Sequence, residues 1–326
     1  MTVLHVPLRM SALHFIDDQA PAPQAAAPCV LVIGNFDGVH RGHAAVLREA
    51  VAIAQSRSLA ANVLTFDPHP AAVVGQGAPP LLTTLERRAQ LMCDLGVEDV
   101  WVRRFDAAFA AWSPERFVRD LVAGALAARV VVVGQNFRFG AKRGGDLAEL
   151  HRMGEQLGFE VCVHATASDA RGPYSSTRAR EAIGSGDLDE VTQVLGRPHE
   201  LSGIVVKGDQ RGRTLGFPTA NLHPVPEMLP PDGVYATRVG QIDDDGRVRP
   251  LGSGGGVTNI GVRPTVGDGR RTVETFVFDH SGDVYGTRLR LELVARLRGE
   301  KRFGGLDELR AQIAADAASA RDRLGL

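Results

Sequence analysis

The first part of the chain alternates between short apolar runs and longer stretches with apolar residues at helical spacing. The apolar runs cover residues 29–33, 62–66, 100–102, 129–133 and 159–163. Runs of this length without polar alternation are typical of strands that are buried on both faces of a parallel sheet. Because helical stretches separate them, the pattern predicts a doubly wound, Rossmann-like α/β domain.

Helix signals mark the segments between these strands. Apolar residues at helical spacing cover residues 46–53. Thr83, with Glu86 three residues later, predicts a capping box at the start of a helix that Gly96 ends. A further helix is expected over residues 146–157.

The pattern changes after Pro198, where strand-like runs follow one another without a helix between them. The runs cover residues 201–206, 234–239, 272–278 and 289–297, and the turns expected between them lie at residues 231–233, 243–246 and 252–256. Short strands joined by turns predict a compact antiparallel β-barrel.

A final amphipathic helix closes the chain. Leu306, Leu309 and Ile313 lie on one face of this helix, which we expect to cover the barrel. The change of pattern places the domain boundary near residue 198. The predicted domains are therefore residues 1–198, which are α/β, and residues 199–326, which form the barrel with its terminal helix.

The most informative motif follows the first apolar run. It is a glycine-rich turn that contains Gly34, Phe36, Asp37, Gly38, His40 and His43. Glycine lets a backbone approach phosphates closely, and the N–H groups at a helix start attract anions. Histidine can donate hydrogen bonds to phosphate oxygens, and the turn lacks the Gly-Lys-Ser/Thr of a P-loop. The turn therefore predicts an ATP site for nucleotidyl transfer. The alternative is a tight strand–helix turn with solvated histidines.

Two further motifs follow predicted strands. Phe66 and His69 belong to one of them, and Asn136 and Arg138 belong to the other, at residues 134–140. Ligands of open α/β sheets bind outside the carboxyl ends of the strands, so three motifs at this edge predict one binding site. A satisfied structural histidine is the alternative for His69.

Composition narrows the classes of function. The 326 residues are 44% hydrophobic and 23% charged with a formal net charge of −1, which gives no support to a broadly basic nucleic-acid-binding protein. Cys29, Cys93 and Cys162 lack the spacing of a zinc or redox site, so reduced thiols are expected. No membrane-length apolar stretch or signal-peptide pattern occurs, which predicts a cytoplasmic protein without a membrane partner. The oligomeric state stays open.

Motifs in both halves of the chain support a family assignment. They lie at residues 34–43, 67–70, 134–140 and 175–178 in the first half, and at residues 208–221, 233–235, 259–265 and 273–276 in the second. Over roughly residues 29–326 the chain resembles the bifunctional riboflavin kinase/FMN adenylyltransferases of prokaryotes, also called FAD synthetases. The resemblance implies that riboflavin and ATP give FMN, and that FMN and ATP then give FAD and pyrophosphate, with Mg²⁺ as the cofactor.

The resemblance places adenylyl transfer in the first domain. His40 and His43 would hold the ATP phosphates and offset charge as pyrophosphate leaves, within the turn that carries Gly34, Phe36, Asp37 and Gly38. Ser176, Thr177 and Arg178 begin a helix and would bind the same phosphates, although residues 175–177 taken alone indicate an N-cap. The implied flavin contacts are Phe66, His69, Asn136 and Arg138.

The resemblance places riboflavin phosphorylation in the second domain. Glu274 would be the base that takes the proton of the ribityl hydroxyl, although taken alone it indicates an outward-facing strand residue. Thr219 and Asn221 point the same way on an extended segment and offer neutral oxygens to Mg²⁺. The expected ATP contacts are Gly208, Arg211, Gly212, Arg213, Gly216, Pro218 and Thr219. By itself this glycine-rich segment would indicate a flexible hairpin.

Three alternative functions stay open at this point. The chain could keep one activity and use its other domain as a scaffold, or it could bind flavin as a regulator without turnover. The regulator would be expected to lack Glu274 or the paired histidines, and the sequence has them all. The third alternative is a tRNA-ligating enzyme with the same His-x-Gly-His turn, and the near-neutral charge counts against it.

Overall fold

The chain forms two compact units in a computed structural model. They are Met1–Ser175 and Ser176–Leu326. The structure describes residues 13–17, 27–75, 77–208, 212, 216–262 and 271–326. Among these residues, no helix combines the length and the apolar character that crossing a membrane requires.

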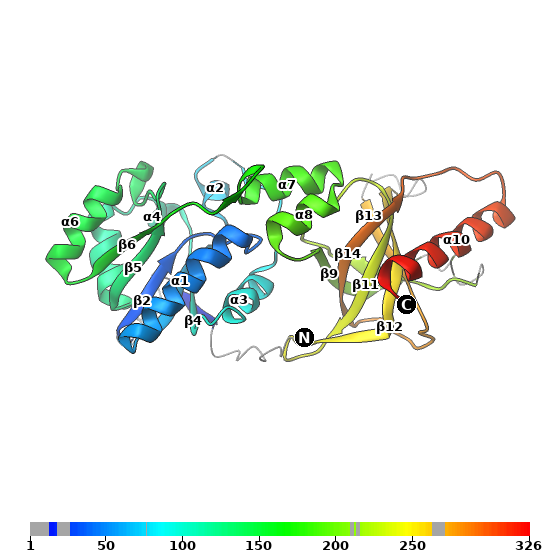
Figure 1. The fold of residues 1–326 in the computed structure, drawn as a ribbon, viewed down its shortest axis with the longest axis horizontal. Coiled ribbons are helices and arrows are strands. Elements are labelled where there is room, and N and C mark those ends of the chain that lie inside the picture. The colour runs from blue at the N-terminus through cyan, green and yellow to red at the C-terminus, as the bar shows by residue number, and fades with distance from the viewer. Residues whose placement is uncertain (1–12, 18–26, 76, 209–211, 213–215, 263–270) are drawn as a thin grey trace. The chain divides into compact units, whose positions relative to one another are not determined.

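A parallel sheet forms the centre of the first unit (Figure 1). Within the described residues its six strands lie in the order β1-β4-β3-β2-β5-β6. They are β1 (Leu13–Ile16), β2 (Cys29–Ile33), β3 (Ala60–Asp67), β4 (Asp99–Arg104), β5 (Ala128–Gly134) and β6 (Glu160–His164). The chain runs from β2 outward to β3 and β4, then returns to β5 on the other side of β2. The order therefore reverses between β2 and β5, and ligands of such sheets bind at that switch point.

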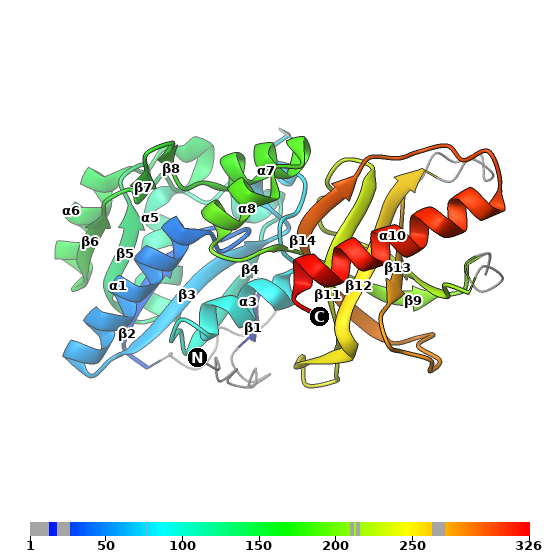
Figure 2. The same ribbon diagram turned by 45° about the vertical axis from the view of Figure 1, so that its right-hand side comes forward.

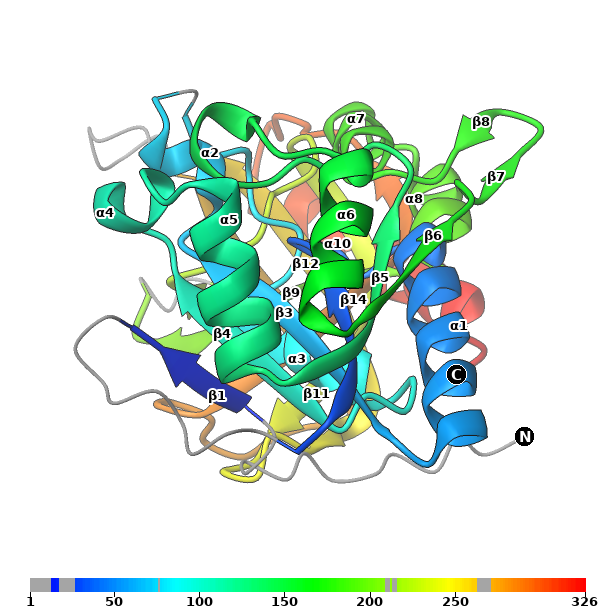
Figure 3. The same ribbon diagram turned by 90° about the vertical axis from the view of Figure 1, so that its left-hand side faces the viewer.

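Helices cover both faces of this sheet (Figure 3). Helices α1 (Arg41–Arg57) and α3 (Leu85–Cys93) pack on one face, and the π-helix η2 (Phe117–Ala125) and α6 (Leu147–Leu157) pack on the other. The shorter elements are α2 (Pro70–Val73), α4 (Ala107–Ala110), α5 (Pro114–Arg116), η3 (Ala141–Arg143), β7 (Ser168–Asp169) and β8 (Gly172–Pro173). Because both faces are buried, the strands are almost continuously apolar, and the predicted α/β architecture is confirmed.

The second unit begins with two helices and continues as a barrel (Figure 2). The helices are α7 (Ser176–Ser185) and α8 (Leu188–Leu195). The closed antiparallel barrel has the order β10-β13-β12-β11-β14-β9. Its strands are β9 (His199–Val206), β10 (Thr219–His223), β11 (Gly233–Ile242), β12 (Val248–Val262), β13 (Arg271–Val277) and β14 (Arg288–Arg298). This confirms the predicted barrel, and helix α10 (Leu306–Leu324) lies across β11 and β12.

The glycine run at residues 252–256 does not form the expected turn. It lies inside β12, where Arg238 of β11 pairs with Gly255 and Gly240 pairs with Pro250, so the residues between them bulge out of the ladder. Gly252 has a φ of 59° there, a left-handed conformation that glycine adopts without steric cost. The prediction of a turn was wrong because glycines in a long strand can serve a bulge as well as a turn.

Helix α10 covers the barrel with its C-terminal half only. Ala320 and Leu324 are buried against barrel residues that include Phe278. Leu306, by contrast, is 69% exposed, so the expectation that it packs on the barrel was wrong. Helical periodicity identifies one face of the helix, but it does not show how far along that face the contact extends.

Helix α3 begins one residue later than its capping-box pattern predicts. The N-cap is Thr84, whose side chain accepts a hydrogen bond from the main-chain nitrogen of Arg87 at 3.2 Å. Thr83 is buried and contacts the histidine turn instead. The predicted cap at Thr83 was therefore wrong, and the hydroxyl has a different role.

Candidate active sites

The turn after β2 has an unusual backbone conformation. Phe36, Gly38 and Val39 have φ angles of 52°, 83° and 38°, which all lie in the left-handed region. Such a conformation costs about 1–3 kcal/mol for a residue other than glycine, and it persists only where the surroundings impose it. Phe36 and Val39 are both buried in the core beneath α1, which anchors the two ends of the turn.

His40 and His43 stand at the start of α1. His40 is the N-cap, and its Nδ1 accepts a hydrogen bond from the main-chain nitrogen of His43 at 3.2 Å. In a neutral His40 ring the proton must then lie on Nε2, which makes that atom a donor. The two rings are stacked with centroids 3.6 Å apart.

His43 is held neutral before any ligand binds. Burial lowers its pKa well below the ordinary value of 6.5, and His40 and Arg88 add to this effect. Its Nδ1 is covered and has no hydrogen-bond partner within the described part of the chain. An anionic phosphate placed against this ring would favour the protonated form and offset the low pKa.

The loop after β3 lies beside the histidine turn. The side-chain amide of Asn35 is 3.3 Å from Nε2 of His69. His69 is also the N-cap of α2, where its Nδ1 accepts from the main-chain nitrogen of Ala71 at 3.2 Å. Phe66 is half-buried at the end of β3 and meets Phe105 edge-on, with ring centroids 5.8 Å apart. Two of the three predicted motifs therefore meet at this edge of the sheet.

The loop after β5 carries the third motif. Asn136 is exposed, and the guanidinium of Arg138 pairs with the Asp146 carboxylate at 3.3 Å. Phe137 stacks on Phe139 with ring centroids 5.5 Å apart. Phe139 is buried while Phe137 is half-buried, so Phe139 belongs to the core.

Ser176, Thr177 and Arg178 form the first turn of α7, in the second unit. The Nε of Arg178 donates a hydrogen bond to the Glu190 carboxylate of α8 at 2.6 Å, and both side chains are largely buried. This ion pair joins α7 to α8. It gives Arg178 a contact within its own unit that the sequence pattern does not reveal.

Three polar side chains lie in register on the outer face of the barrel. Glu274 of β13 pairs with Asn221 of β10 on one side and with Asn259 of β12 on the other. Residues opposite one another on neighbouring strands share a face, so these side chains lie side by side. Val273 and Thr275 alternate with Glu274 and are buried in the barrel. The predicted base therefore faces away from the core.

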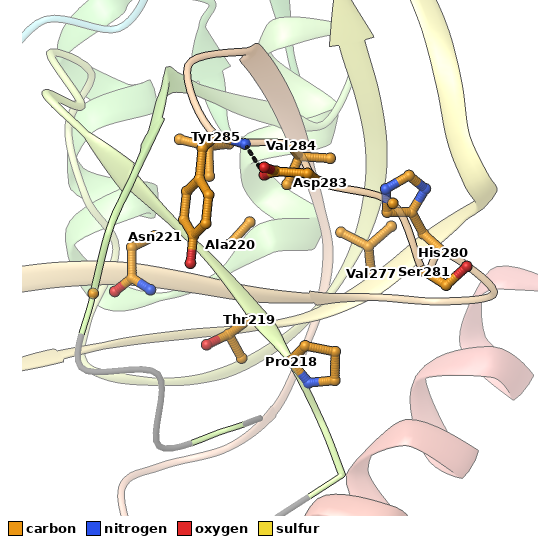
Figure 4. A pocket seen from close by; sticks show the side chains of 13 residues that line it. Pro218, Thr219, Ala220, Asn221, Val277, His280, Ser281, Asp283, Val284 and Tyr285 are labelled. Carbon is orange, nitrogen blue, oxygen red and sulfur yellow. Dashed lines mark hydrogen bonds between the residues drawn. The ribbon is translucent and has the colours of Figure 1, made fainter. Parts of the chain in front are cut away.

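A pocket of about 450 Å³ lies on one side of this polar row. Its walls include Gly208, Pro218, Thr219, Asn221 and the loop of residues 280–285. Figure 4 shows His280 and Ser281 at one end of the pocket, and Asn221 and Tyr285 at the other.

A second pocket, of about 950 Å³, contains Glu274. Aromatic rings of Phe217, Phe276 and Phe303 contribute to its walls. Leu309 and Ile313 of α10 also line it, which explains why this end of the helix is not packed onto the barrel. Thr219 borders both pockets.

At two glycines near Thr219, neighbouring groups lie too close for an added Cβ atom to fit without a shift. A Cβ on Gly208 would lie 2.6 Å from the Asn221 amide nitrogen, and one on Gly212 would lie 2.3 Å from the Phe217 carbonyl oxygen. Gly216 has a φ of 88°. Arg211 and Arg213, which we expected to contact ATP, lie outside the described residues.

The loops that complete the two pockets were not predicted from the sequence. His280, Ser281, Asp283 and Tyr285 line the smaller pocket, and Arg298, Lys301 and Phe303 line the larger one. The run His-Ser-Gly-Asp at residues 280–283, between two predicted strands, was the available signal.

The donor set around Thr219 suits a hard cation that is already bound to phosphates. Within the described ranges, no group of three or more His, Cys, Asp or Glu residues could hold a metal ion alone. The Thr219 hydroxyl and the Asn221 amide oxygen supply neutral oxygens on β10. Mg²⁺ accepts such ligands while phosphates and water complete its shell, so these residues fit Mg²⁺ bound together with ATP.

Comparisons with known proteins match both units. The family model for FAD synthetase matches residues 22–178, and the model for riboflavin kinase matches residues 195–324. Bifunctional riboflavin kinase/FMN adenylyltransferase of Escherichia coli (strain K12) is 39% identical over 318 residues, which span 97% of this chain and 99% of the relative. The protein of the same description from Bacillus subtilis (strain 168) is 34% identical, over 95% of this chain and 97% of the relative.

A solved structure shares the whole architecture. A Streptococcus pneumoniae protein described as a macrolide-efflux protein superimposes with a TM-score of 0.82 at 27% identity, over 95% of this chain and 99% of that one. The sequence matches extend over both halves of the chain and include both sets of motifs. The chain belongs to the family of bifunctional riboflavin kinase/FMN adenylyltransferases.

Proposed function

We propose that this chain phosphorylates riboflavin to FMN in its second unit and adenylylates FMN to FAD in its first unit, with ATP as the donor in both reactions. One observation carries the assignment of the second unit. Thr219 borders both pockets, and Glu274 lines the larger of the two. A phosphoryl group at Thr219 would therefore pass from one pocket to the other.

In the kinase reaction the larger pocket takes riboflavin. Its volume and its aromatic walls suit the flavin ring system, and the smaller pocket takes ATP. Glu274 accepts the proton of the ribityl 5′-hydroxyl as that oxygen attacks the γ-phosphorus of ATP. The bond from the γ-phosphorus to the bridging oxygen breaks, and ADP leaves.

Thr219 and Asn221 would hold Mg²⁺ in this reaction. When bound, the ion neutralises negative charge on the ATP phosphates. Gly208 and Gly212 let the chain pass close to Asn221 and Phe217. Arg211 and Arg213 are proposed to contact the same phosphates, with Gly216 and Pro218 shaping the segment.

In the adenylylation reaction the nucleophile is already ionised. A phosphate oxygen of FMN attacks the α-phosphorus of ATP, and the bond from that phosphorus to pyrophosphate breaks. The main requirements are alignment and charge stabilisation. The N–H of His40 Nε2 donates a hydrogen bond to a phosphate oxygen. The negative charge of the bound phosphates favours the protonated form of His43, whose pKa is otherwise low.

The remaining contacts for FMN adenylylation are proposed from the family. Gly34, Phe36, Asp37 and Gly38 form the turn against the phosphates. Ser176, Thr177 and Arg178 stay ATP contacts that the family resemblance predicts. Phe66, His69, Asn136 and Arg138 are the proposed flavin contacts. Phe66 has an aromatic ring at the carboxyl edge of the sheet, which supports this assignment.

We also propose a domain boundary near residue 198, between residues 1–198 and 199–326. Helix α8 ends at Leu195 and the riboflavin kinase family model begins at residue 195, which supports this position. The two compact units divide earlier in the chain, after Ser175.

We also propose a cytoplasmic location, because both reactions use ATP. The proposed partners are small-molecule substrates, and no role for nucleic acid is proposed.

A time course with the purified full-length chain tests the proposed function. The chain is incubated with riboflavin, ATP and Mg²⁺, and flavins are separated by chromatography. We expect FMN to appear first and FAD to follow. FMN without FAD would leave a kinase with an inactive first unit, and the absence of both products would contradict the proposal and favour a flavin-binding regulator.

A further inference from the structure

Thr83 contacts the histidine turn from a distant part of the chain. Its Oγ1 accepts a hydrogen bond from the main-chain nitrogen of Gly38 at 3.0 Å, across 45 residues of sequence. The same hydroxyl donates to the Asp37 carboxylate at 3.3 Å. Asp37 in turn accepts from the main-chain nitrogens of Leu82 and Thr83, each at 3.1 Å.

Arg88 of α3 holds the other end of the turn. Its Nη1 donates to the Asn35 carbonyl oxygen at 2.9 Å, and its Nη2 lies 3.9 Å from the Asp37 carboxylate. Asp37, Thr83 and Arg88 are at most 5% exposed. Hydrogen bonds shielded from water in this way are stronger than exposed ones, and the loss of one partner leaves the other buried and unsatisfied.

These contacts hold the turn in its left-handed backbone conformation. Phe36, Gly38 and Val39 all have positive φ angles, and Val39 is a β-branched residue for which this conformation is rare. The strain must be imposed by neighbouring groups. The hydrogen bond to Gly38 lies between the two strained non-glycine residues, one residue before Val39 and two before His40.

We propose that Thr83, together with Asp37 and Arg88, is a positioning group for FMN adenylylation, because it fixes the turn that presents His40 and His43 to the phosphates. The inference rests on the proposed function of the first unit. It gives the Asp37 carboxylate a role within the protein, since this carboxylate accepts hydrogen bonds from the segment of Leu82 and Thr83. Arg88 is also among the groups that keep the pKa of His43 low, so one residue serves both geometry and charge.

Thr83 and its neighbour Thr84 provide a matched pair of variants. Each carries one hydroxyl, but Thr83 bonds to the turn while Thr84 caps α3. In the full-length chain, Thr83→Val is expected to lower kcat of FMN adenylylation by at least about tenfold, because small misplacements of catalytic groups are costly. Thr83→Ser keeps the hydroxyl and should retain kcat within about twofold of the parent value.

The control variant separates positioning from stability. Thr84→Val should lower the melting temperature of the first unit, since it removes the N-cap of α3, while kcat stays within about twofold. Riboflavin phosphorylation by the same chains should be unchanged in every variant. We expect KM for ATP in Thr83→Val to change much less than kcat, because alignment in the transition state is what is lost.

Several outcomes would overturn the inference. Unchanged kcat in Thr83→Val, or an equal loss of kcat in Thr84→Val, would show that Thr83 does not position the turn. If Thr83→Val does not fold, Arg88→Lys gives the same test, since it keeps the charge but loses the guanidinium geometry at Asn35. An unsubstituted chain that makes no FAD would instead contradict the proposed function, so the two failures are distinguishable.

Discussion

The main-chain nitrogen of His43 donates a hydrogen bond to the ring of His40 at 3.2 Å, and the two rings stack 3.6 Å apart. Each histidine therefore influences the protonation of the other. The hydrogen bond assigns the proton of a neutral His40 ring to Nε2, and the nearby ring helps to keep His43 unprotonated. In this arrangement the ring of His43 is held neutral at the place where the phosphates are proposed to bind.

The low pKa of His43 predicts acid sensitivity of the first unit. The pKa lies below 6.5 in the folded chain and near 6.5 in the unfolded chain, so the folded state binds fewer protons. The free energy of unfolding is then highest above pH 6.5 and falls as the pH drops toward the lowered pKa, by at most about 1.4 kcal/mol per pH unit. Urea unfolding at pH 7.5 and 5.5 measures this dependence.

The chain offers a probe that reports this unit alone. Its two tryptophans, Trp101 and Trp112, both lie in the first unit, so their fluorescence follows the unfolding of that unit. His43→Gln should show a weaker fall in stability between pH 7.5 and 5.5 than the unsubstituted chain. An equal fall in both chains would assign the acid sensitivity to other groups.

The sequence predicts most of the architecture because its periodicities are local. Cys29–Ile33 and Leu147–Leu157 have the expected element types, and the alternating and non-alternating apolar runs separate the barrel from the sheet. The N-cap of α3 shows a limit of prediction from local patterns. The capping-box spacing favours Thr83, which has Glu86 three residues later. In the structure the Thr83 hydroxyl bonds to Gly38, far away in the sequence, and Thr84 caps the helix.

In the candidate sites, too, local patterns predict some features, and contacts between distant elements decide the others. Spacing placed His40 and His43 in a motif, and the family resemblance singled out Glu274. The register that sets Glu274 between Asn221 and Asn259 depends on strand pairing. The ion pair of Arg178 with Glu190 depends on the packing of α7 against α8. Such contacts between elements have no local sequence signature.

Gly208 offers a test of the close approach in the kinase unit. In Gly208→Ala the added methyl group would lie within 2.6–2.8 Å of the Asn221 amide, so this side chain must move from its position beside Glu274. We expect kcat of riboflavin phosphorylation to fall at least about tenfold. FMN adenylylation should not change, and both are measured with saturating ATP.

Gly305→Ala is the control for this substitution. Gly305 has open space around it and an extended backbone with φ −173°, so an alanine fits there. It should retain both activities. If Gly208→Ala is as active as Gly305→Ala, the Asn221 amide does not depend on the glycine.

The ion pair between Arg298 and Asp316 predicts an effect on riboflavin binding. Asp316 is buried and accepts from Nε and Nη2 of Arg298 at 2.8–3.1 Å, which ties α10 to β14 at the wall of the larger pocket. Asp316→Ala leaves the guanidinium without this partner and should destabilise the second unit by roughly 3 kcal/mol. We expect KM for riboflavin to rise by about tenfold, measured in initial-rate assays.

The opposite end of α10 provides the matched control. Arg321 pairs with Asp279 at 2.8 Å, but both side chains are exposed and neither lines the larger pocket. Asp279→Ala should leave KM for riboflavin unchanged, because exposed pairs contribute little and are screened by solvent. An equal rise in KM in both variants would mean that the position of α10 as a whole, and not the wall of the pocket, controls riboflavin binding.

We propose that the two reactions use separate catalytic residues, His43 in the first unit and Glu274 in the second. The most direct measurement assays His43→Ala and Glu274→Gln, each for riboflavin phosphorylation and for FMN adenylylation, with Trp fluorescence and circular dichroism as folding controls. We predict that His43→Ala loses adenylylation at least about a hundredfold and keeps phosphorylation, and that Glu274→Gln shows the reverse. If either folded variant loses both activities, the division between the two units is contradicted.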